Sequence, residues 1–297
     1  MKMQKFALFA AAAGFAAVLF IHGPAHASAQ TVTPTSTDAT TTAPSSDETS
    51  TSTATTTPSD ATSSAPAVSA DDCSITPGDI AQITAVQNDP TLTPSQEVVA
   101  ELAVRKSLIV QTITCAQNDL QTLQSALGAV SVSKDADAAT IQNQLESNLS
   151  GAGNFYALEL SKVNDAGIAG TKAIASEILS WRQSTYAPLV GDVNNFVLWA
   201  GDQGLFSTAA TRMTETQQAV AFLESASPNA DLQTAFNAAY ASFGTAKSDN
   251  GAAEAAFQQS LAPDQTLTLI KQSLGALQDT YQQFFTVSTI IQTLLPQ

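Results

Sequence analysis

The two cysteines, Cys73 and Cys115, are the residues of this sequence that most directly indicate a covalent link. Neither has a Cys or His neighbour at the spacing of a metal site. An even number of cysteines is typical of a disulfide in a chain that leaves the cytoplasm. We therefore predict a Cys73–Cys115 disulfide, which closes a long loop and stabilises the fold by roughly 4 kcal/mol in the chain-entropy model. The alternative is a pair of inert buried thiols.

Histidine is nearly absent, and this narrows the chemistry that the chain can perform. The only two histidines, His22 and His26, lie in the first 29 residues. If that segment is removed, the chain has no Ser-His-Asp or Cys-His arrangement, no imidazole metal ligand and no Glu-x-x-His motif. We predict no catalytic residue, no metal site and no cofactor, and hence a protein that is not an enzyme. An enzyme that relies on carboxylates alone is the remaining alternative.

Two groups of acidic residues could in principle bind a cation. Asp135 and Asp137 form an Asp-x-Asp pair that could begin a calcium loop, but the later ligands and the glycine of such a loop are missing. Residues 248–254, which end at Glu254, resemble the middle of such a loop. Acids at helix starts, where they offset the helix dipole, explain both groups more simply.

Four aromatic residues form a possible patch for an apolar ligand or a partner: Trp181, Phe196, Trp199 and Phe206. The two tryptophans are five α-helical turns apart, so on an unbroken helix they would share a face. Pro188 lies between them and should kink or break that helix. The alternative is that all four residues belong to the core.

The N-terminus has the pattern of a secretory signal. Lysines precede an apolar run over residues 6–21, and small residues follow at a spacing that predicts cleavage after Ala27 or Ala29. We interpret residues 1–29 as a signal peptide, with an uncleaved membrane anchor as the alternative. Both interpretations place the rest of the chain outside the cytoplasm, as a secreted, periplasmic or cell-surface protein.

A low-complexity segment separates this signal from the only region that can fold. More than half of residues 30–70 are Ser or Thr, with four prolines and no basic residue. Such a segment buries too little apolar surface to offset its ordering entropy, so we predict a disordered linker or stalk. Residues 71–297 are then a single domain.

The composition and spacing of this domain predict an all-α fold. Apolar residues recur at steps of three and four, with coiled-coil-like heptads over 267–295. Glycines at 128, 167, 201 and 244 should end helices, so the chain folds back on itself. We expect an antiparallel bundle of about four long and three shorter helices, the shorter ones near 208–225, 228–247 and 251–261. Four Ser/Thr/Pro signals mark helix starts: Thr76-Pro77, Thr93-Pro94, Ser227-Pro228 and Pro263-Asp264.

Charge limits the range of partners. The chain has a formal net charge of −15, and loss of the signal lysines makes it two units more negative. Nucleic acid is therefore not expected to bind, and contact with a membrane is expected only through an uncleaved N-terminal segment. The function that fits best is an exported, non-enzymatic module with a structural or interaction role at or beyond the cell envelope, whose partner is an extracytoplasmic protein or polysaccharide. A carrier that holds an apolar ligand in the bundle core is the alternative.

Overall fold

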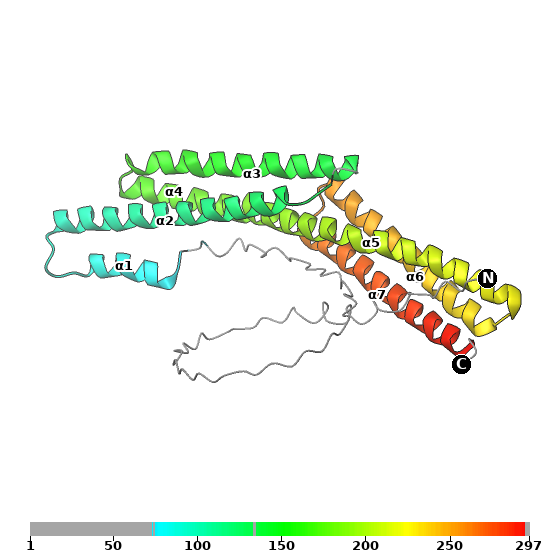
Figure 1. Ribbon diagram of the computed structural model, residues 1–297. Helices are drawn as coiled ribbons and strands as arrows, with labels where there is room; N and C mark the ends of the chain where they lie inside the picture. The colour runs from blue at the N-terminus through cyan, green and yellow to red at the C-terminus, as the bar shows by residue number, and fades with distance from the viewer. Residues whose placement is uncertain (1–72, 74, 133–134, 295–297) are drawn as a thin grey trace, which may run out of the picture. The chain divides into compact units, whose positions relative to one another are not determined.

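The computed structural model describes residues 73, 75–132 and 135–294, and this part of the chain is all-α, as predicted. The predicted signal peptide and linker lie outside the described residues. Seven α-helices and one π-helical turn follow one another (Figure 1): α1 Pro77–Gln87, α2 Pro94–Gly128, α3 Ala136–Val163, α4 Ile168–Trp181, η2 Arg182–Tyr186, α5 Ala187–Ala226, α6 Ala230–Gln258 and α7 Pro263–Leu294. Five of the α-helices are long, one more than predicted.

Helix starts follow local capping chemistry. Thr76 and Thr93 each form a capping box with the residue three positions on, and a proline occupies the first turn in both cases. The predicted start at Ser227-Pro228 is two residues early. Asn229 is the cap of α6, because its side chain accepts a hydrogen bond from the Leu232 amide at 2.9 Å.

Two of the four predicted glycine breaks are wrong. Gly128 ends α2 and Gly167 caps α4, but helices α5 and α6 continue through Gly201 and Gly244. No described glycine has a positive φ. Both interior glycines are exposed, where a helical glycine costs only about 1 kcal/mol relative to alanine. The core contacts of the flanking turns outweigh this cost, so the separate helices predicted over 208–225, 228–247 and 251–261 are parts of α5 and α6.

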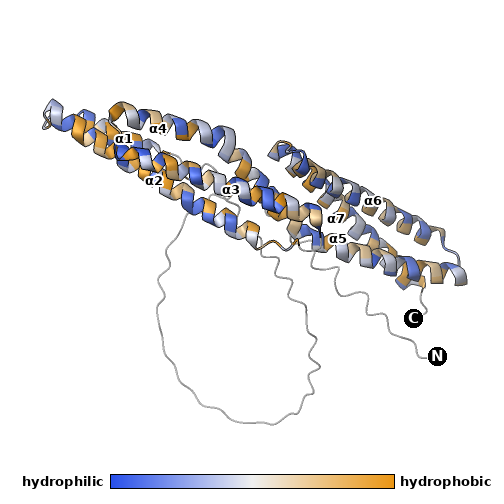
Figure 2. Cartoon of the chain, turned by 90° about the horizontal axis from the view of Figure 1, so that it is seen from above, coloured by the Kyte–Doolittle hydropathy of each residue, from blue (hydrophilic) through white to orange (hydrophobic). Residues whose placement is uncertain are grey.

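The buried apolar residues form two cores that share α5. The first core joins α2, α3, α4 and the N-terminal half of α5, with Leu123, Leu149 and Phe196 among its buried members. The second joins the C-terminal half of α5 to α6 and α7 around Phe206, Phe236 and Leu277. Hydrophobic and hydrophilic residues alternate along the helices, as amphipathic packing requires (Figure 2). None of the described helices has the length and hydropathy needed to span a bilayer.

Gly191 of α5 lies directly against the start of α7. A Cβ at Gly191 would lie 2.7 Å from the Cβ of Pro263, where α7 begins. The Asn195 side chain donates a hydrogen bond to the Pro263 carbonyl at 2.8 Å, one turn further along α5. The absence of a side chain at Gly191 therefore allows the start of α7 to lie directly against α5.

We expect Gly191→Ala to lower the free energy of unfolding by about 1–3 kcal/mol, because the new methyl group overlaps a rigid proline ring. Gly204→Ala, on the same helix with no atom within 4 Å of its Cβ position, is the matched control. It should raise stability by about 0.5–1 kcal/mol through helix propensity. Urea unfolding of both variants measures the difference, and equal effects at the two positions would contradict the proposed contact.

Candidate functional site

The predicted disulfide is present between Cys73 and Cys115, whose Cα atoms are 5.6 Å apart. Cys73 precedes α1, and Cys115 lies within the long helix α2. For the sulfurs to meet, α1 must run back along α2, and α1 does pack on α2. Because α1 contains no fully buried residue, its position depends strongly on this bond.

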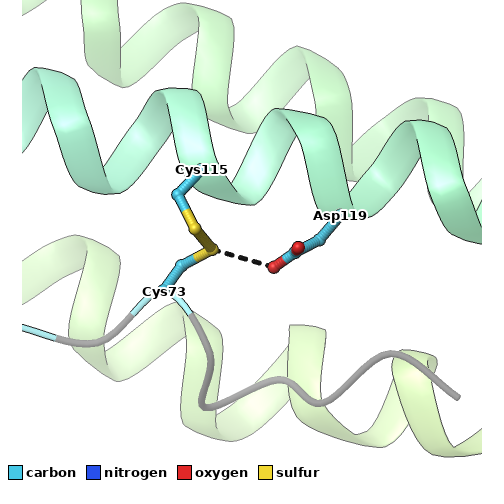
Figure 3. A group of neighbouring side chains, drawn as sticks. All are labelled: Cys73, Cys115 and Asp119. Atoms are coloured by element: carbon cyan, nitrogen blue, oxygen red, sulfur yellow. Dashed lines mark hydrogen bonds between the residues drawn. A yellow bond between two sulfur atoms is a disulfide. The ribbon is translucent and has the colours of Figure 1, made fainter. Parts of the chain in front are cut away.

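A carboxylate lies beside the disulfide (Figure 3). The Asp119 Oδ2 atom is 2.8 Å from the Cys73 sulfur, and the ligand atoms of Asp119 and both cysteines lie within 4.8 Å of one another. A disulfide sulfur carries no hydrogen, so the dashed contact is a sulfur–oxygen approach, and only a reduced Cys73 thiol could donate a hydrogen bond there. In the bonded state neither sulfur is a thiolate that could bind a metal.

The helix continues past Pro188, where the sequence predicted a kink or a break, because a π-helical turn precedes the proline. The Ala187 amide hydrogen-bonds to the carbonyl of Arg182, five residues earlier. Pro188 has no amide hydrogen to donate, and the wider turn takes up this loss without ending the helix. π-helical turns are frequent at functional sites, so the surroundings of this one form the candidate site.

The π-helical turn organises an aromatic cluster, defined by Phe155, Tyr156, Trp181 and Tyr186. Phe155 stacks on Trp181 with ring centroids 4.0 Å apart, and Trp181 and Tyr186 are near parallel at 5.9 Å. Trp181 and Tyr186 are five residues apart, a separation that the π-helical turn brings toward one face. Tyr156 meets both of these rings edge-on. Trp181 is thus held between Phe155 and Tyr186.

The aromatic cluster also contains buried polar groups, namely the phenols of Tyr156 and Tyr186 and the neighbouring Arg182. Arg182 is 8% exposed, and its guanidinium lies over the Tyr186 ring at 5.6 Å. Burial raises the pKa of Tyr156 to about 12, and the neighbouring Arg182 opposes this shift. Burial likewise raises the pKa of Tyr186, and Tyr156 and Asp119 add to the shift. Both phenols are therefore neutral at physiological pH and hold the cluster in place without adding charge.

An open groove of about 550 Å³ lies along α4 and the π-helical turn, and Phe155 is its one lining residue from α3. We call it the α3–α4 groove. Six of its lining residues are Phe155, Trp181, Ser176, Ser180, Ser184 and Glu177. The hollow is wide and shallow, so it resembles a surface for a ligand that remains partly in solvent more than an enclosed cavity.

Three charged residues, Glu159, Lys162 and Glu177, form a cluster beside this groove. Lys162 contacts Glu159 at 2.5 Å and Glu177 at 3.4 Å. Glu159 is fully buried, and its second carboxylate oxygen has no hydrogen-bond partner among the described residues. Lys162 is therefore shared by both carboxylates, and the three residues together carry one net negative charge.

The four aromatic residues singled out in the sequence are not brought together. Only Trp181 lines the groove. Phe196 and Trp199 are buried in the first core, where both pack against Phe257, and Phe206 is in the second core. Sequence reasoning missed Phe155, Tyr156 and Tyr186. A signal for the groove was present in the serines at 176, 180 and 184, which are spaced four residues apart.

The two acidic groups that the sequence presented separately lie together. Carboxylate oxygens of Asp135, Asp137 and Glu254 are within 4.8 Å of one another. Asp135 caps α3, as expected for an acid at a helix start, because its Oδ1 accepts from the backbone amides of Asp137 and Ala138. Partial burial raises the pKa of Glu254, and the charges of Asp135 and Asp137 raise it further.

Two further carboxylates, on α5, are half-buried. Burial raises the pKa of both Asp192 and Asp202 to about 6. One carboxylate oxygen of Asp202 is buried and has no hydrogen-bond partner among the described residues. Each ionised carboxylate therefore destabilises the folded state near neutral pH.

Comparison of the chain with family models, with curated proteins and with solved structures found no match in any of the three. The assignment of function therefore depends on the physical features of the chain itself.

The disulfide should control the order of α1. Reduction, or the Cys73→Ser variant, is expected to remove amide-exchange protection from residues 77–87, while α3 and α7 keep theirs. The loss in unfolding free energy should be about 2–4 kcal/mol. Hydrogen-exchange mass spectrometry with and without a dithiol reductant measures this, and unchanged protection of α1 after reduction would refute the dependence.

Asp202→Asn should stabilise the fold at pH 7 by about 1–2 kcal/mol, a figure discounted for partial solvent screening. The folded-state pKa of about 6 exceeds the ordinary value of 3.8. The penalty of ionisation is therefore complete above pH 6 and disappears as the pH falls toward 3.8. Denaturant unfolding from pH 4 to pH 8 should show this trend. Asp279→Asn, at an exposed position on α7, is the control. A pH-independent gain in Asp202→Asn would contradict the burial argument.

Proposed function

We propose that this chain is an exported, non-enzymatic helical module that binds a partner at or beyond the cell envelope, and that the α3–α4 groove is its contact site. The observation that carries the proposal is the groove itself, where a rigid aromatic cluster and a row of hydroxyls face solvent beside a π-helical turn. The disulfide supports a location outside the cytoplasm, since such bonds persist mainly in oxidising compartments.

A surface site has better support than a ligand held inside the bundle. Trp199 is 1% exposed and packs against Phe196 and Phe257, so its ring fills the space that an apolar ligand between the helices would need. The groove, by contrast, is open to solvent and leaves Phe155 and Trp181 only partly buried. A binding role thus fits the groove without any rearrangement of either core.

The proposed binding role can be tested with the protein as exported. Labelled protein added to intact cells of the source organism should be retained at the cell envelope. Ser180→Trp, which fills the groove with a large ring, should reduce retention at least tenfold. Ser207→Trp, at an exposed serine of α5 outside the groove, should leave it unchanged. Absence of retention of the unaltered protein, or equal retention of the two variants, would refute the proposed role.

A further inference from the structure

The serine row on one wall of the α3–α4 groove is the first of three features that define its ligand. Ser176 and Ser180 lie one helical turn apart on α4, and Ser184 follows in the π-helical turn. Many hydroxyls of this chain bond back to a carbonyl of their own helix, as Thr208 and Thr214 do. No such bond occurs for the exposed Ser176 and Ser180 in the described part of the chain, so both hydroxyls can donate to and accept from a ligand.

The second feature is an apolar surface that is fixed in advance. Phe155 and Trp181 line the groove while stacked on each other at 4.0 Å. Tyr186 covers the other side of Trp181, and Tyr156 supports both Trp181 and Tyr186 edge-on. A surface held in this way loses little conformational entropy when a ligand binds.

The third feature is charge. Glu177 is the only ionisable residue of the lining, and it contacts the Lys162 ammonium group at 3.4 Å. Because Lys162 also pairs with the buried Glu159 at 2.5 Å, it offsets the charge of Glu177 only in part. The chain as a whole carries a formal net charge of −15, which repels polyanions. The groove therefore selects against anionic ligands, because its one neighbouring cation is already paired. Its one carboxylate is also already paired, which leaves a cationic ligand little to gain.

We propose that the α3–α4 groove binds a neutral polysaccharide, an inference that rests on the proposed binding role. A sugar ring has an apolar C–H face, which fits the surface of Phe155 and the edge of Trp181. Its rim carries hydroxyls that can exchange hydrogen bonds with Ser176 and Ser180. Successive rings of a chain would place their hydroxyls against serines one helical turn apart, while one ring covers the single aromatic surface. A peptide segment would need backbone partners or a charged anchor, and the only charged residue of the lining is Glu177, which is already paired with Lys162.

Calorimetric titration of the protein as exported tests this inference. The probes are neutral six-sugar oligomers of β-1,4-linked glucose, β-1,4-linked N-acetylglucosamine and α-1,6-linked mannose. At least one should bind saturably and quench the emission of Trp181, which is partly exposed, while Trp199 is shielded in the core. If none of the three binds, the inference is wrong.

Variants locate the binding. Ser180→Ala should weaken binding of the sugar oligomer about fivefold or more, because it removes a hydrogen-bonding group from the groove. Ser207→Ala is the matched control and should bind as the unaltered protein does. Glu177→Gln should change the affinity less than threefold, since a neutral ligand does not depend on that charge. A tenfold loss in Glu177→Gln would instead indicate a cationic ligand and overturn the proposal, as would an unchanged affinity in Ser180→Ala.

The two proposals fail in different ways. If the protein is retained by cells in a groove-dependent manner but binds no neutral oligomer, the binding role stands and the partner is a protein. If neither retention nor oligomer binding occurs, the binding role itself is wrong. Retention that a soluble oligomer displaces supports both proposals together.

Discussion

The structure depends on one continuous helical rod, which runs from Ile168 to Ala226 as α4, η2 and α5. Its middle contributes Phe196 to the first core and its later turns contribute Phe206 to the second. Neither core is complete without it. The rod continues past Pro188 through the π-helical turn, in which the Ala187 amide bonds to the Arg182 carbonyl, and this turn accommodates the missing amide hydrogen of the proline. The local defect that preserves the rod is also the feature that brings Trp181 and Tyr186 into a stack and thus builds one end of the groove.

Features of this fold that depend on residues close in the sequence were predictable, and features that depend on tertiary contacts were not. The starts of α1 and α2 were predictable because a capping box is made by residues three apart. The buried face of α2 was also predictable, because apolar residues recur there at steps of three and four and the following six are buried: Ile109, Ile113, Ala116, Leu120, Leu123 and Leu127. The continuation of α5 through Gly201 and of α6 through Gly244 was not predictable. Whether a glycine ends a helix depends on the tertiary contacts of its neighbours, which no local pattern contains.

The candidate site was less predictable than the fold for the same reason. Phe155 and Trp181 are distant in the sequence and meet only because α3 and α4 pack together. Asp135 and Glu254, each assigned to a helix start or a turn, are brought together by the packing of α3 against α6. The disulfide was predictable because only one pairing of two cysteines exists. What a single sequence lacks is the list of helix neighbours, and the contact of Phe155 with Trp181 depends on that list.

A single lysine, Lys162, pairs with the carboxylates beside and within the groove. Glu159 is fully buried, a placement that requires a nearby cation, and Lys162 supplies it from one turn further along α3. The same ammonium group also contacts Glu177 on α4, so the need to pair Glu159 fixes the position of the cation that Glu177 shares. A groove without Lys162 would present an uncompensated carboxylate on an already acidic surface and would favour cations. The pairing of the one carboxylate in the groove is therefore a consequence of how the fold accommodates a buried acid.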